Sequence, residues 1–546
     1  MSLFNFFPER LLRYFPALTS GFIMTLAFPA TQWSWLAWGA LIPLLLSIRG
    51  TSPAQAFGMG LAMGMGHFFS LIYWILPTLR IYGNLPVLLA MPVLILMVFY
   101  LALYPAFFCM IISRDCFDTH FSAFLPLKAA SLWVALEFTR ANIFTGFPWG
   151  LTGYSQYLNI NLIQMADITG VYGVSFIIVA VNATLAMAWH HRGNEQHPPE
   201  IKKSRRIALF TWAALLLPTL GGIMIYGHKS MTATQTAMAH APKQVVSVIQ
   251  GNIPQAAKWD DAYKTVTVST YCELSRSNLS SRPRDLIVWP ETALPFYYTW
   301  DEESSHGVNQ CIRQSNAWFI IGSPAFSLVG EDDFHFFNRA YMLTPRAIVS
   351  DFYDKSHLVP FGEYVPFGKY LTFLDKLTSQ AGDFSPGSSN AKPLAFKGSR
   401  AGVLICFEII FPELAATVVK NGADLLVTMT NDAWFGRTSA PLQHFSMAVF
   451  RAVENRRSVA RAANTGISGF IDPRGVITGT TALFEKTTLT RQVPCISSMS
   501  FYTTHGDVFA WVCLISALIF ACPWKKFYMK RQPPRQPQQS RPPDGQ

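Results

Sequence analysis

Long apolar runs at both ends of the chain determine its expected architecture. A stretch of about 17 to 25 residues with few or no charges can cross the hydrocarbon core of a bilayer as a helix. Trp33–Ile48 is short and Phe124–Phe138 contains Lys128 and Glu137, so these two are the weakest of about eight candidates. The runs that predict transmembrane helices are Tyr14–Ala30, Trp33–Ile48, Ala56–Leu79, Leu85–Ile112, Phe124–Phe138, Ile168–Trp189, Ile207–Tyr226 and Val508–Trp524.

The region between the last two apolar runs has a different pattern. Short apolar segments alternate with polar, helix-like segments, which is typical of an α/β sandwich. Strands are expected at Val245–Gln250, Leu286–Trp289, Trp318–Ile321, Asn338–Leu343, Ala401–Ile405, Leu425–Met429 and within Val459–Ile471, and helices near Tyr263–Asn278, His306–Ser315, Leu414–Lys420 and Phe445–Arg456.

The two patterns together divide the chain into four parts. Residues 1–228 form a membrane domain with about seven helices, and residues 229–505 form the α/β domain. Residues 506–524 form a final membrane helix, and residues 525–546 form a basic tail, rich in Pro and Gln, that is expected to be disordered. The predicted fold class is therefore a multi-pass α-helical membrane protein with an α/β sandwich domain outside the cytoplasm.

The composition agrees with this division. Of the 546 residues, 51% are hydrophobic and only 14% are charged, which is unusual for a soluble enzyme. The net charge of +11 does not indicate nucleic-acid binding, because much of it lies beside the apolar runs and in the tail, where it suits anionic lipid headgroups.

The positions of Lys and Arg predict the orientation, since basic flanks stay in the cytoplasm. With eight spans, both ends of the chain are cytoplasmic and the α/β domain lies outside. Alternatively, the first run is a cleaved secretion signal, but a cut after Ala30 would place the bulky Phe28 where a small side chain is favoured, so a retained helix is preferred. The cytoplasmic side collects Arg10, Arg13, Arg49, Arg114, Arg192, Lys202, Lys203, Arg205, Arg206 and the basic tail, whereas the other side has only Arg80, Arg140 and Lys229 in its short connections.

The candidate chemistry lies at the ends of predicted strands. Cys406 directly follows the strand Ala401–Ile405, Glu291 follows Leu286–Trp289, and Lys355 lies in the segment Tyr353–Glu363. A thiol near its ordinary pKa of about 8.5 is mostly protonated at neutral pH, so it needs a base and a nearby positive charge. Glu291 would accept and return the thiol proton, and Lys355 would face the oxyanion of a tetrahedral intermediate.

Simpler explanations exist for each residue alone. A single Cys after an apolar run is usually a buried small hydrophobe, and a single Glu or Lys usually lies on the surface. None of the eight cysteines has a spacing that indicates a metal, and no metal or cofactor is expected. In an oxidising compartment Cys272 and Cys311 are a candidate disulfide pair, whereas Cys406 must remain free if it is the nucleophile.

The segments around Glu291, Lys355 and Cys406, in this order, resemble the nitrilase or carbon–nitrogen hydrolase superfamily, whose triad is Glu, Lys and Cys. The likeness extends over roughly residues 244–496. An outer domain of this kind between the last two of eight helices is similar to one family in particular, the bacterial apolipoprotein N-acyltransferases. Further matching segments are Gly251–Gln255 with Trp259, Phe361–Pro366, Asn431–Gly436, Gly146–Trp149 and Gly153–Gln156.

The resemblance implies a two-step transfer. Cys406 takes an acyl chain from a membrane phospholipid as a thioester and passes it to the α-amine of a diacylglyceryl-cysteine at the N-terminus of an apolipoprotein. It further implies a protein of the bacterial inner membrane whose catalytic domain faces the periplasm. A monomer is expected, although nothing in the sequence determines the oligomeric state. Anchoring the catalyst at the lipid surface is physically reasonable, because moving an acyl chain into water costs about 0.8 kcal/mol per CH₂.

The resemblance also implies supporting residues. Glu363 and Glu408 would orient Lys355 or Cys406, and weaker candidates for substrate or loop contacts are Trp259, Asn338, Trp434 and Phe407. The family commonly has Tyr where this chain has Phe407, so a hydroxyl is missing there.

Two other functions remain open at this stage. A membrane-tethered amidase or nitrilase would release its acyl product to water. A transporter or structural membrane protein with a degenerate outer domain would depend instead on carboxylates such as Glu137 and Asp167, which are costly inside lipid unless they lie at the interface.

Overall fold

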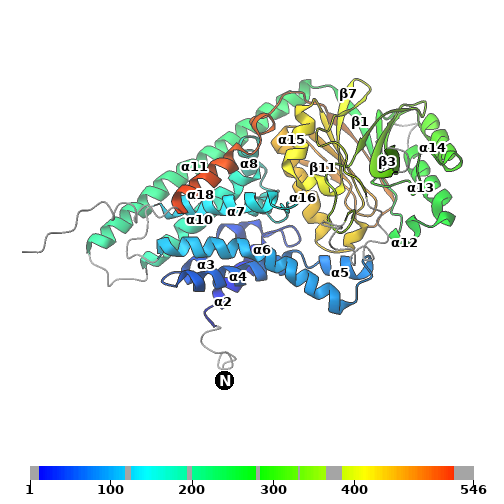
Figure 1. Ribbon diagram of the computed structural model, residues 1–546. Coiled ribbons are helices and arrows are strands. Elements are labelled where there is room, and N and C mark those ends of the chain that lie inside the picture. Colours follow the sequence, from blue (N-terminus) through cyan, green and yellow to red (C-terminus); the bar gives the residue numbers. More distant parts are fainter. Residues whose placement is uncertain are drawn as a thin grey trace, which may run out of the picture.

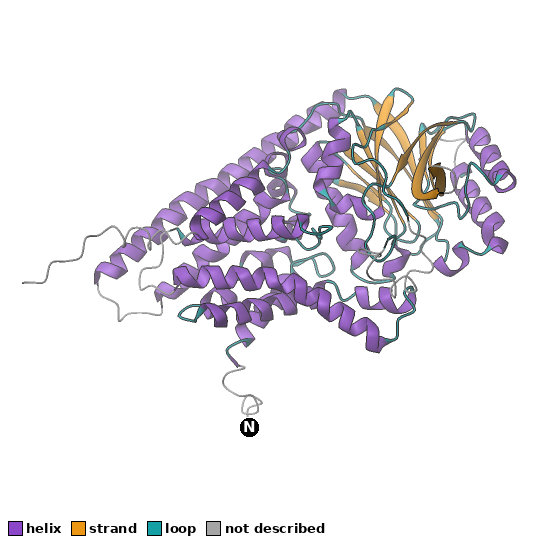
Figure 2. Cartoon of the chain, viewed as in Figure 1, coloured by secondary structure: helices purple, strands orange, loops and turns teal. Residues whose placement is uncertain are grey.

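The computed structural model describes residues 12–116, 124–192, 199–277, 283–329, 333–364 and 384–521. Helices occupy one end of the molecule and two β-sheets the other (Figures 1 and 2). The α/β sandwich attached to a helical membrane part is confirmed. The predicted basic tail lies outside the described residues.

The helical part begins with α2 and ends with the long helix α11. Its elements are α2 (Phe15–Leu26), η2 (Ser34–Trp38), α3 (Ile42–Ser47), α4 (Pro53–Leu71), α5 (Ile75–Ile81), α6 (Val87–Cys116), α7 (Leu125–Asn142), η3 (Thr152–Gln156), α8 (Ile160–Ile163), α9 (Ala166–Thr169), α10 (Val171–Arg192) and α11 (Pro199–His240). Near the C-terminus, α17 (Phe501–His505) and α18 (Val508–Ala521) return to this part.

Three described helices are long and apolar enough to cross a membrane, within α6, α10 and α11. A fourth span results if α4 and α5, bent by 53° at their junction, count as one. The predicted span Trp33–Ile48 is divided into η2 and α3, and the short apolar helices α2 and α18 fall below membrane length. The number of eight spans therefore stays a prediction.

Helices α4 and α6 pack closely because glycines of α4 face α6. A Cβ atom on Gly60 would lie 2.2 Å from the carbonyl oxygen of Pro105, and one on Gly64 would lie 2.6 Å from the Cα atom of Ala102. Small residues of this kind allow helix backbones to approach within a membrane, where packing rather than hydrophobicity drives association.

The α/β domain consists of two six-stranded sheets. The first has the order β12-β1-β2-β3-β4-β5 and the second β11-β10-β9-β8-β7-β6. In each sheet three neighbouring strands are parallel, β1 to β3 and β7 to β9, and the outer strands are antiparallel. The strands are β1 (Lys243–Gln250), β2 (Leu286–Val288), β3 (Trp318–Val329), β4 (Asp333–Leu343), β5 (Val349–Asp354), β6 (Leu394–Phe396), β7 (Ser399–Ile405), β8 (Leu425–Thr430), β9 (Ser458–Ala463), β10 (Gly469–Ile471), β11 (Ile477–Thr480) and β12 (Thr487–Pro494).

Helices cover both outer faces of the sheet pair. The elements α12 (Gln255–Lys258), η4 (Asp261–Tyr263), α13 (Lys264–Arg276) and α14 (Glu302–Ser315) belong to the first sheet, and η6 (Cys406–Ile410), α15 (Pro412–Lys420), η7 (Asp432–Phe435) and α16 (Ala440–Asn455) to the second. Figure 1 shows α15 and α16 between the second sheet and the membrane helices. The central strands β2, β8 and β9 are buried along their whole length, as parallel strands covered on both faces are expected to be.

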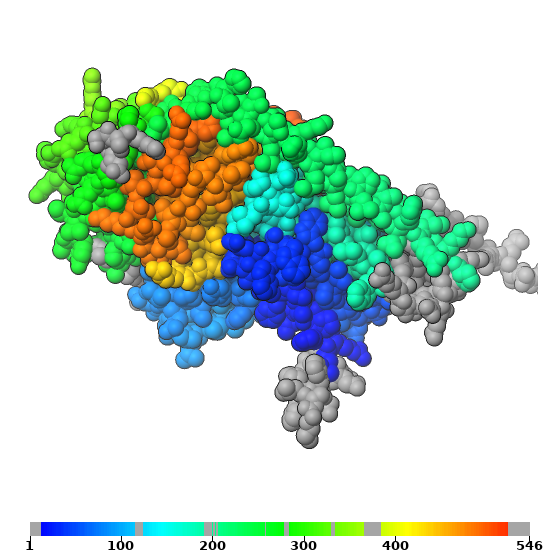
Figure 3. All heavy atoms as spheres, turned by 180° about the vertical axis from the view of Figure 1, so that it is seen from behind, coloured from blue at the N-terminus to red at the C-terminus, as the bar shows by residue number. Residues whose placement is uncertain are grey.

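The two parts share buried polar contacts as well as apolar ones. Asp167, at α9, forms an ion pair of 2.5 Å with Arg456 and accepts a hydrogen bond of 2.8 Å from the hydroxyl of Tyr226 in α11. In α16, Arg451 bonds Glu454 and the hydroxyl of Tyr154 in η3. From behind, the yellow and orange surface of the α/β domain borders directly on the blue and cyan membrane helices (Figure 3).

Glu137 has a different environment. Its Oε1 accepts hydrogen bonds from the indole of Trp133 and the backbone N–H of Thr152, whereas its buried Oε2 has no hydrogen-bond partner among the described residues. The candidate pair Cys272 and Cys311 does not form a disulfide, since both residues are free thiols. Their side chains are buried between α13 and α14.

Candidate active site

Three strand ends bring Glu291, Lys355 and Cys406 together. These residues follow β2, β5 and β7 respectively. Because β5 pairs antiparallel with β4, and β4 antiparallel with β3, β5 runs in the same direction as β2 and β3. Their carboxyl ends therefore lie at one edge of the first sheet, facing the carboxyl end of β7 in the second. All three side chains are buried, with 7%, 1% and 8% of their surface exposed.

The ammonium of Lys355 lies between two carboxylates. Its Nζ is 2.9 Å from Oε1 of Glu363 and 3.3 Å from Oε1 of Glu291. The second oxygen of Glu363 accepts a hydrogen bond of 2.8 Å from the backbone N–H of Val359, which fixes the carboxylate. This arrangement orients the lysine for an oxyanion without leaving a buried charge unpaired.

Two asparagines hold the glutamates in place. The side-chain amide of Asn338, on β4, donates to Oε1 of both Glu291 and Glu363, at 2.8 and 3.0 Å. The backbone N–H of Asn431 donates to Oε2 of Glu291 at 2.9 Å. Glu291 is thus fixed by hydrogen bonds to both of its oxygens, a pre-organisation that a positioned base requires.

Cys406 occupies a strained backbone conformation. Its φ angle is +54°, in the left-handed region that non-glycine residues rarely adopt. The strain lies where β7 turns abruptly into the 3-10 helix η6, and it directs the side chain out of the strand. The hydroxyl of Thr430 is 3.2 Å from the sulfur.

Glu408 connects the segment that follows Lys355 with the strand that precedes Cys406. Its Oε1 accepts hydrogen bonds from the Tyr353 hydroxyl, from the backbone N–H and hydroxyl of Ser356, and from the backbone N–H of His357, at 2.7 to 3.0 Å. Its Oε2 accepts from the N–H of Ile405 at 2.7 Å. The carboxylate is fully buried, and burial raises its pKa against the effect of these donors.

The charges at the site favour a protonated thiol at rest. Burial raises the pKa of the Cys406 thiol, and the carboxylate of Glu291 raises it further. Burial opposes ionisation of Glu291, but Lys355 and Lys258 outweigh it and hold the pKa of this carboxyl below its ordinary value. Burial also favours a neutral Lys355, yet Glu363 and Glu291 prevail and raise its pKa. Proton transfer from sulfur to Glu291 is therefore expected only as the sulfur attacks a substrate.

Lys258 is a second buried ammonium that sequence reasoning missed. It is 3% exposed, and its Nζ donates to the backbone carbonyl of Glu291 at 3.3 Å. Burial lowers its pKa to about 8, although Glu291 and Cys406 act in the opposite direction. The only sequence signal was its position beside Trp259 in the segment that resembles the family.

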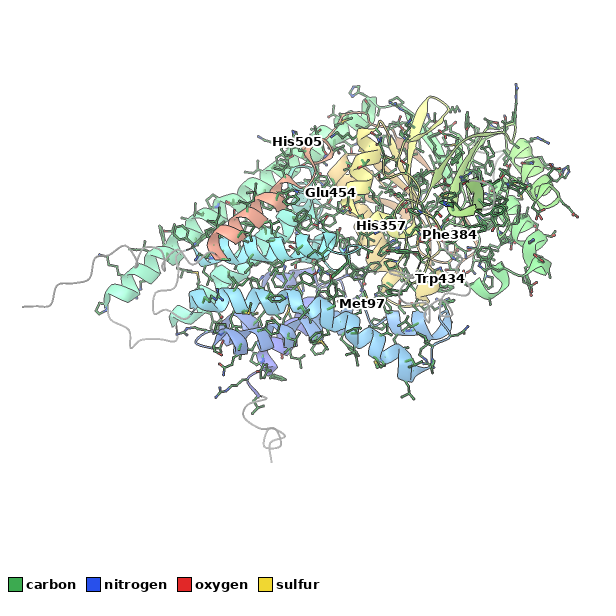
Figure 4. All side chains as sticks on the ribbon, in the orientation of Figure 1. Met97, His357, Phe384, Trp434, Glu454 and His505 are labelled. Carbon is green, nitrogen blue, oxygen red and sulfur yellow. The ribbon has the colours of Figure 1, made fainter. Side chains whose placement is uncertain are left out.

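The weaker candidates lie at the edge of the site or away from it. Trp259 is half exposed. Trp434 packs against Tyr82, the residue directly after α5, with the ring centroids 4.9 Å apart. Phe407 packs edge-to-face on Phe411 at 5.2 Å. Figure 4 shows His357 and Trp434 in the zone where the α/β domain meets the membrane helices. Asn338, by contrast, is hydrogen-bonded to Glu291, and Phe407 is adjacent to Cys406 in the chain.

No group of three or more His, Cys, Asp or Glu side chains in the described parts of the chain is arranged to hold a metal ion. The site combines the thiol of Cys406, the carboxylates of Glu291 and Glu363 on either side of Lys355, and a second amine, Lys258, beside Glu291. This set of groups is suited to acyl transfer through sulfur.

Two packed sheets with Glu, Lys and Cys at facing strand ends, attached to membrane helices, define a membrane-anchored enzyme of the carbon–nitrogen hydrolase class. The family model for carbon-nitrogen hydrolases matches residues 245–497, and the model for the N-terminal domain of apolipoprotein N-acyltransferases matches residues 20–184. The chain belongs to the apolipoprotein N-acyltransferase family, which confirms the resemblance inferred from the sequence.

The similarity to individual relatives covers nearly the whole chain. The apolipoprotein N-acyltransferase of Geobacter metallireducens is 43% identical over 95% of this chain and 96% of that protein. The one of Methylococcus capsulatus is 32% identical over 90% of this chain and 92% of that protein. Among solved structures, a carbon-nitrogen hydrolase from Helicobacter pylori has a TM-score of 0.37 and 14% identity, covering 49% of this chain and 94% of that one.

Proposed function

We propose that this protein transfers an acyl chain from a membrane phospholipid, through a thioester on Cys406, to the N-terminal amine of a diacylglyceryl-cysteine in an apolipoprotein. The observation that supports this most directly is the convergence of Glu291, Lys355 and Cys406 in a chain of this family. The similarity to the apolipoprotein N-acyltransferases of Geobacter metallireducens and Methylococcus capsulatus supports the reaction class.

In the first step Cys406 attacks the ester carbonyl of the phospholipid. Its thiol proton moves to Glu291 as the carbon–sulfur bond forms, and the negative oxygen of the tetrahedral intermediate faces the ammonium of Lys355. The carbon–oxygen bond then breaks, and Glu291 returns the proton to the departing glycerol oxygen. The products are a lysophospholipid and a thioester.

In the second step the amine of the acceptor attacks the thioester. Glu291 accepts a proton from the attacking nitrogen, the carbon–nitrogen bond forms, and the carbon–sulfur bond breaks. The same proton then neutralises the departing sulfur, which restores the resting thiol. A thioester is reactive enough for an amine and persists if water is kept from it, and the burial of Cys406 supports such protection.

The membrane part brings both lipid substrates to the site. Concentrating a donor and an acceptor in the same lipid surface raises their effective concentration. The distribution of Lys and Arg along the chain supports an α/β domain on the periplasmic side of the bacterial inner membrane, with both ends in the cytoplasm. We further propose that the catalytic unit is a monomer, since Glu291, Lys355 and Cys406 all come from one chain.

The test follows the acyl group. Purified protein in detergent is incubated with phospholipid radiolabelled in its acyl chain, without acceptor, and the protein-bound label is measured. We expect label on Cys406 that hydroxylamine releases and that moves to a diacylglyceryl lipopeptide when this acceptor is added. We expect no label in Cys406→Ala. Label that survives Cys406→Ala contradicts the proposal, and release of free fatty acid with no transfer to lipopeptide would indicate a hydrolase instead.

A further inference from the structure

A buried polar cluster lies next to Cys406, and the proposed proton transfers do not use it. Its members are Thr430 at the end of β8, Asp432 in η7, His444 in α16 and Arg461 in β9. Each is at most 1% exposed. Four polar side chains at such depth require an explanation, because burying them is costly unless their bonds are satisfied.

Two contacts connect this cluster with Cys406, one at its sulfur and one at its backbone carbonyl. The hydroxyl of Thr430 is 3.2 Å from the sulfur of Cys406 and 2.8 Å from Oδ1 of Asp432. Nη2 of Arg461 donates to Oδ2 of Asp432 and to Nδ1 of His444, both at 2.9 Å. Nε2 of His444 is 3.1 Å from the backbone carbonyl of Cys406.

These contacts determine the protonation of His444. A carbonyl oxygen only accepts, so Nε2 must carry a hydrogen, and the bond from Arg461 requires Nδ1 to be without one. Burial and then the charge of Arg461 lower the pKa of His444, which agrees with a neutral ring. Nδ1 therefore has no hydrogen for Oδ1 of Asp432, although the two atoms are 3.1 Å apart. That oxygen receives its side-chain hydrogen bond from Thr430.

A hydroxyl has only one hydrogen, so Thr430 can donate to Asp432 or to Cys406 but not to both at once. A carboxylate is a better acceptor than a neutral thiol, so the hydrogen faces Asp432 while the thiol is protonated. When the sulfur becomes negative, it competes for the same hydrogen. Arg461 stays bonded to Asp432 in either case and keeps that carboxylate paired.

We propose that Thr430 is a positioning residue whose hydroxyl rotates from Asp432 to Cys406 and stabilises the sulfur whenever it is anionic. This happens twice in each cycle, when Glu291 removes the thiol proton and when the thioester sulfur departs. The hydroxyl keeps its own proton throughout. The inference rests on the proposed function in that it takes Cys406 as the nucleophile.

His444 supports the same sulfur through the backbone. Its bond to the Cys406 carbonyl holds the residue in its left-handed conformation. The imidazole is itself stacked on Trp149, with centroids 5.8 Å apart and planes at 25°. Trp149 belongs to the Gly146–Trp149 segment of the membrane part, so the rear wall of the nucleophile is built from both parts of the protein.

The effect of losing the Thr430 hydroxyl depends on the competition between Asp432 and Cys406 for its hydrogen. A hydrogen bond to a charged group changes an equilibrium by roughly ten- to a hundredfold. Because Thr430 gives up its bond to Asp432 in exchange, the lower end applies. Loss of the hydroxyl is thus expected to raise the pKa of the Cys406 thiol by about one unit and to slow thioester formation about tenfold.

The experiment compares Thr430→Val, which keeps the shape but has no hydroxyl, with Thr430→Ser, which keeps the hydroxyl. Alkylation of Cys406 by iodoacetamide is followed from pH 7 to 10.5 by peptide mass spectrometry, and thioester formation is measured against phospholipid concentration. We expect Thr430→Val to displace the alkylation profile upward by about one pH unit and to lower the rate at saturating phospholipid about tenfold with KM unchanged. Thr430→Ser should match the wild type within about twofold.

A merely structural role for Thr430 would lower the melting temperature and would slow alkylation in Thr430→Ser as much as in Thr430→Val, and that result would overturn the inference. So would a Thr430→Val profile that coincides with the wild type. If Thr430→Val does not fold, Thr430→Ala carries the same expectation. Alkylation needs neither donor nor acceptor lipid, so this test stands even if the wild type proves not to transfer acyl groups.

Discussion

Replacing Glu408 tests whether one buried carboxylate holds the segment after Lys355 against the strand that ends at Cys406. In Glu408→Ala the three backbone N–H donors of Ser356, His357 and Ile405 lose their acceptor and cannot turn away, unlike the hydroxyl donors. At about 1 to 3 kcal/mol for each unsatisfied buried donor, the loss is at least about 3 kcal/mol.

Glu408→Gln is the matched control. Its amide oxygen can take the place of Oε1 and keep four donors, so that only the N–H of Ile405 faces an amide nitrogen. The expected cost is about 1 kcal/mol, or a fall in melting temperature of about 2 to 4 °C for a domain of this size, against at least about 6 °C for the alanine variant. Thermal unfolding in detergent measures this order directly.

Activity gives the second half of the same test. Because Lys355 and Cys406 lose their common support, thioester formation in Glu408→Ala should fall more than a hundredfold at saturating phospholipid, and in Glu408→Gln about tenfold. A Glu408→Ala protein that melts with the wild type and labels at the wild-type rate would refute the reasoning. Equal losses in both variants would show that the charge, rather than the set of acceptors, is what matters.

Two further predictions follow from the charges at the site. Lys258→Met removes a positive charge beside Glu291, so the pKa of this carboxyl should rise and the acidic limb of the pH–rate profile should move to higher pH. Since the pKa of Lys258 is about 8, the lysine is charged mainly below pH 8. The rates of variant and wild type should therefore differ below pH 8 and converge above it. An unchanged acidic limb would exclude Lys258 from the site. Burial and Glu291 raise the pKa of the Cys406 thiol, so its alkylation at pH 7.5 should be slower than that of free cysteine. The alkylation rate should increase about tenfold per pH unit up to at least pH 9.5. A plateau of the rate below pH 8 would show a resting thiolate instead.

The sequence was informative about the site where the signal was local. Glu291 and Cys406 each follow an apolar run, and Lys355 lies in a segment with recognisable neighbours, so the grouping of the three residues was predictable. Lys258 and Thr430 lie beside recognisable segments, but nothing in the sequence assigned their side chains to the site. Their contacts with Glu291 and Cys406 span 33 and 24 residues of the chain and depend on how the two sheets face each other.

The helices show a second limit of sequence reasoning. Hydropathy predicted a span at Ile207–Tyr226, but α11 continues as one helix to His240 and ends two residues before β1. A search for apolar residues stops where the chain becomes polar, while a helix needs only favourable backbone geometry and few breakers. In the opposite direction, the run Trp33–Ile48 carries no charge yet does not form one helix. Gly39 ends η2, and Pro43 lies in the first turn of α3, where its missing N–H is tolerated.

The continuous α11 changes the physical picture of how the catalytic domain is held. A flexible linker would let the domain sample many positions above the bilayer, whereas a helix that passes directly into β1 restricts it to one. Asp167 of the membrane part, paired with Arg456 and bonded by Tyr226 of α11, fixes the rotation about that helix. For the proposed reaction, with a phospholipid donor and a lipid-bearing acceptor, a site fixed at one height and one orientation needs less of its binding energy to bring the reactants together. The buried ion pair is therefore better understood as a determinant of geometry than as a source of stability.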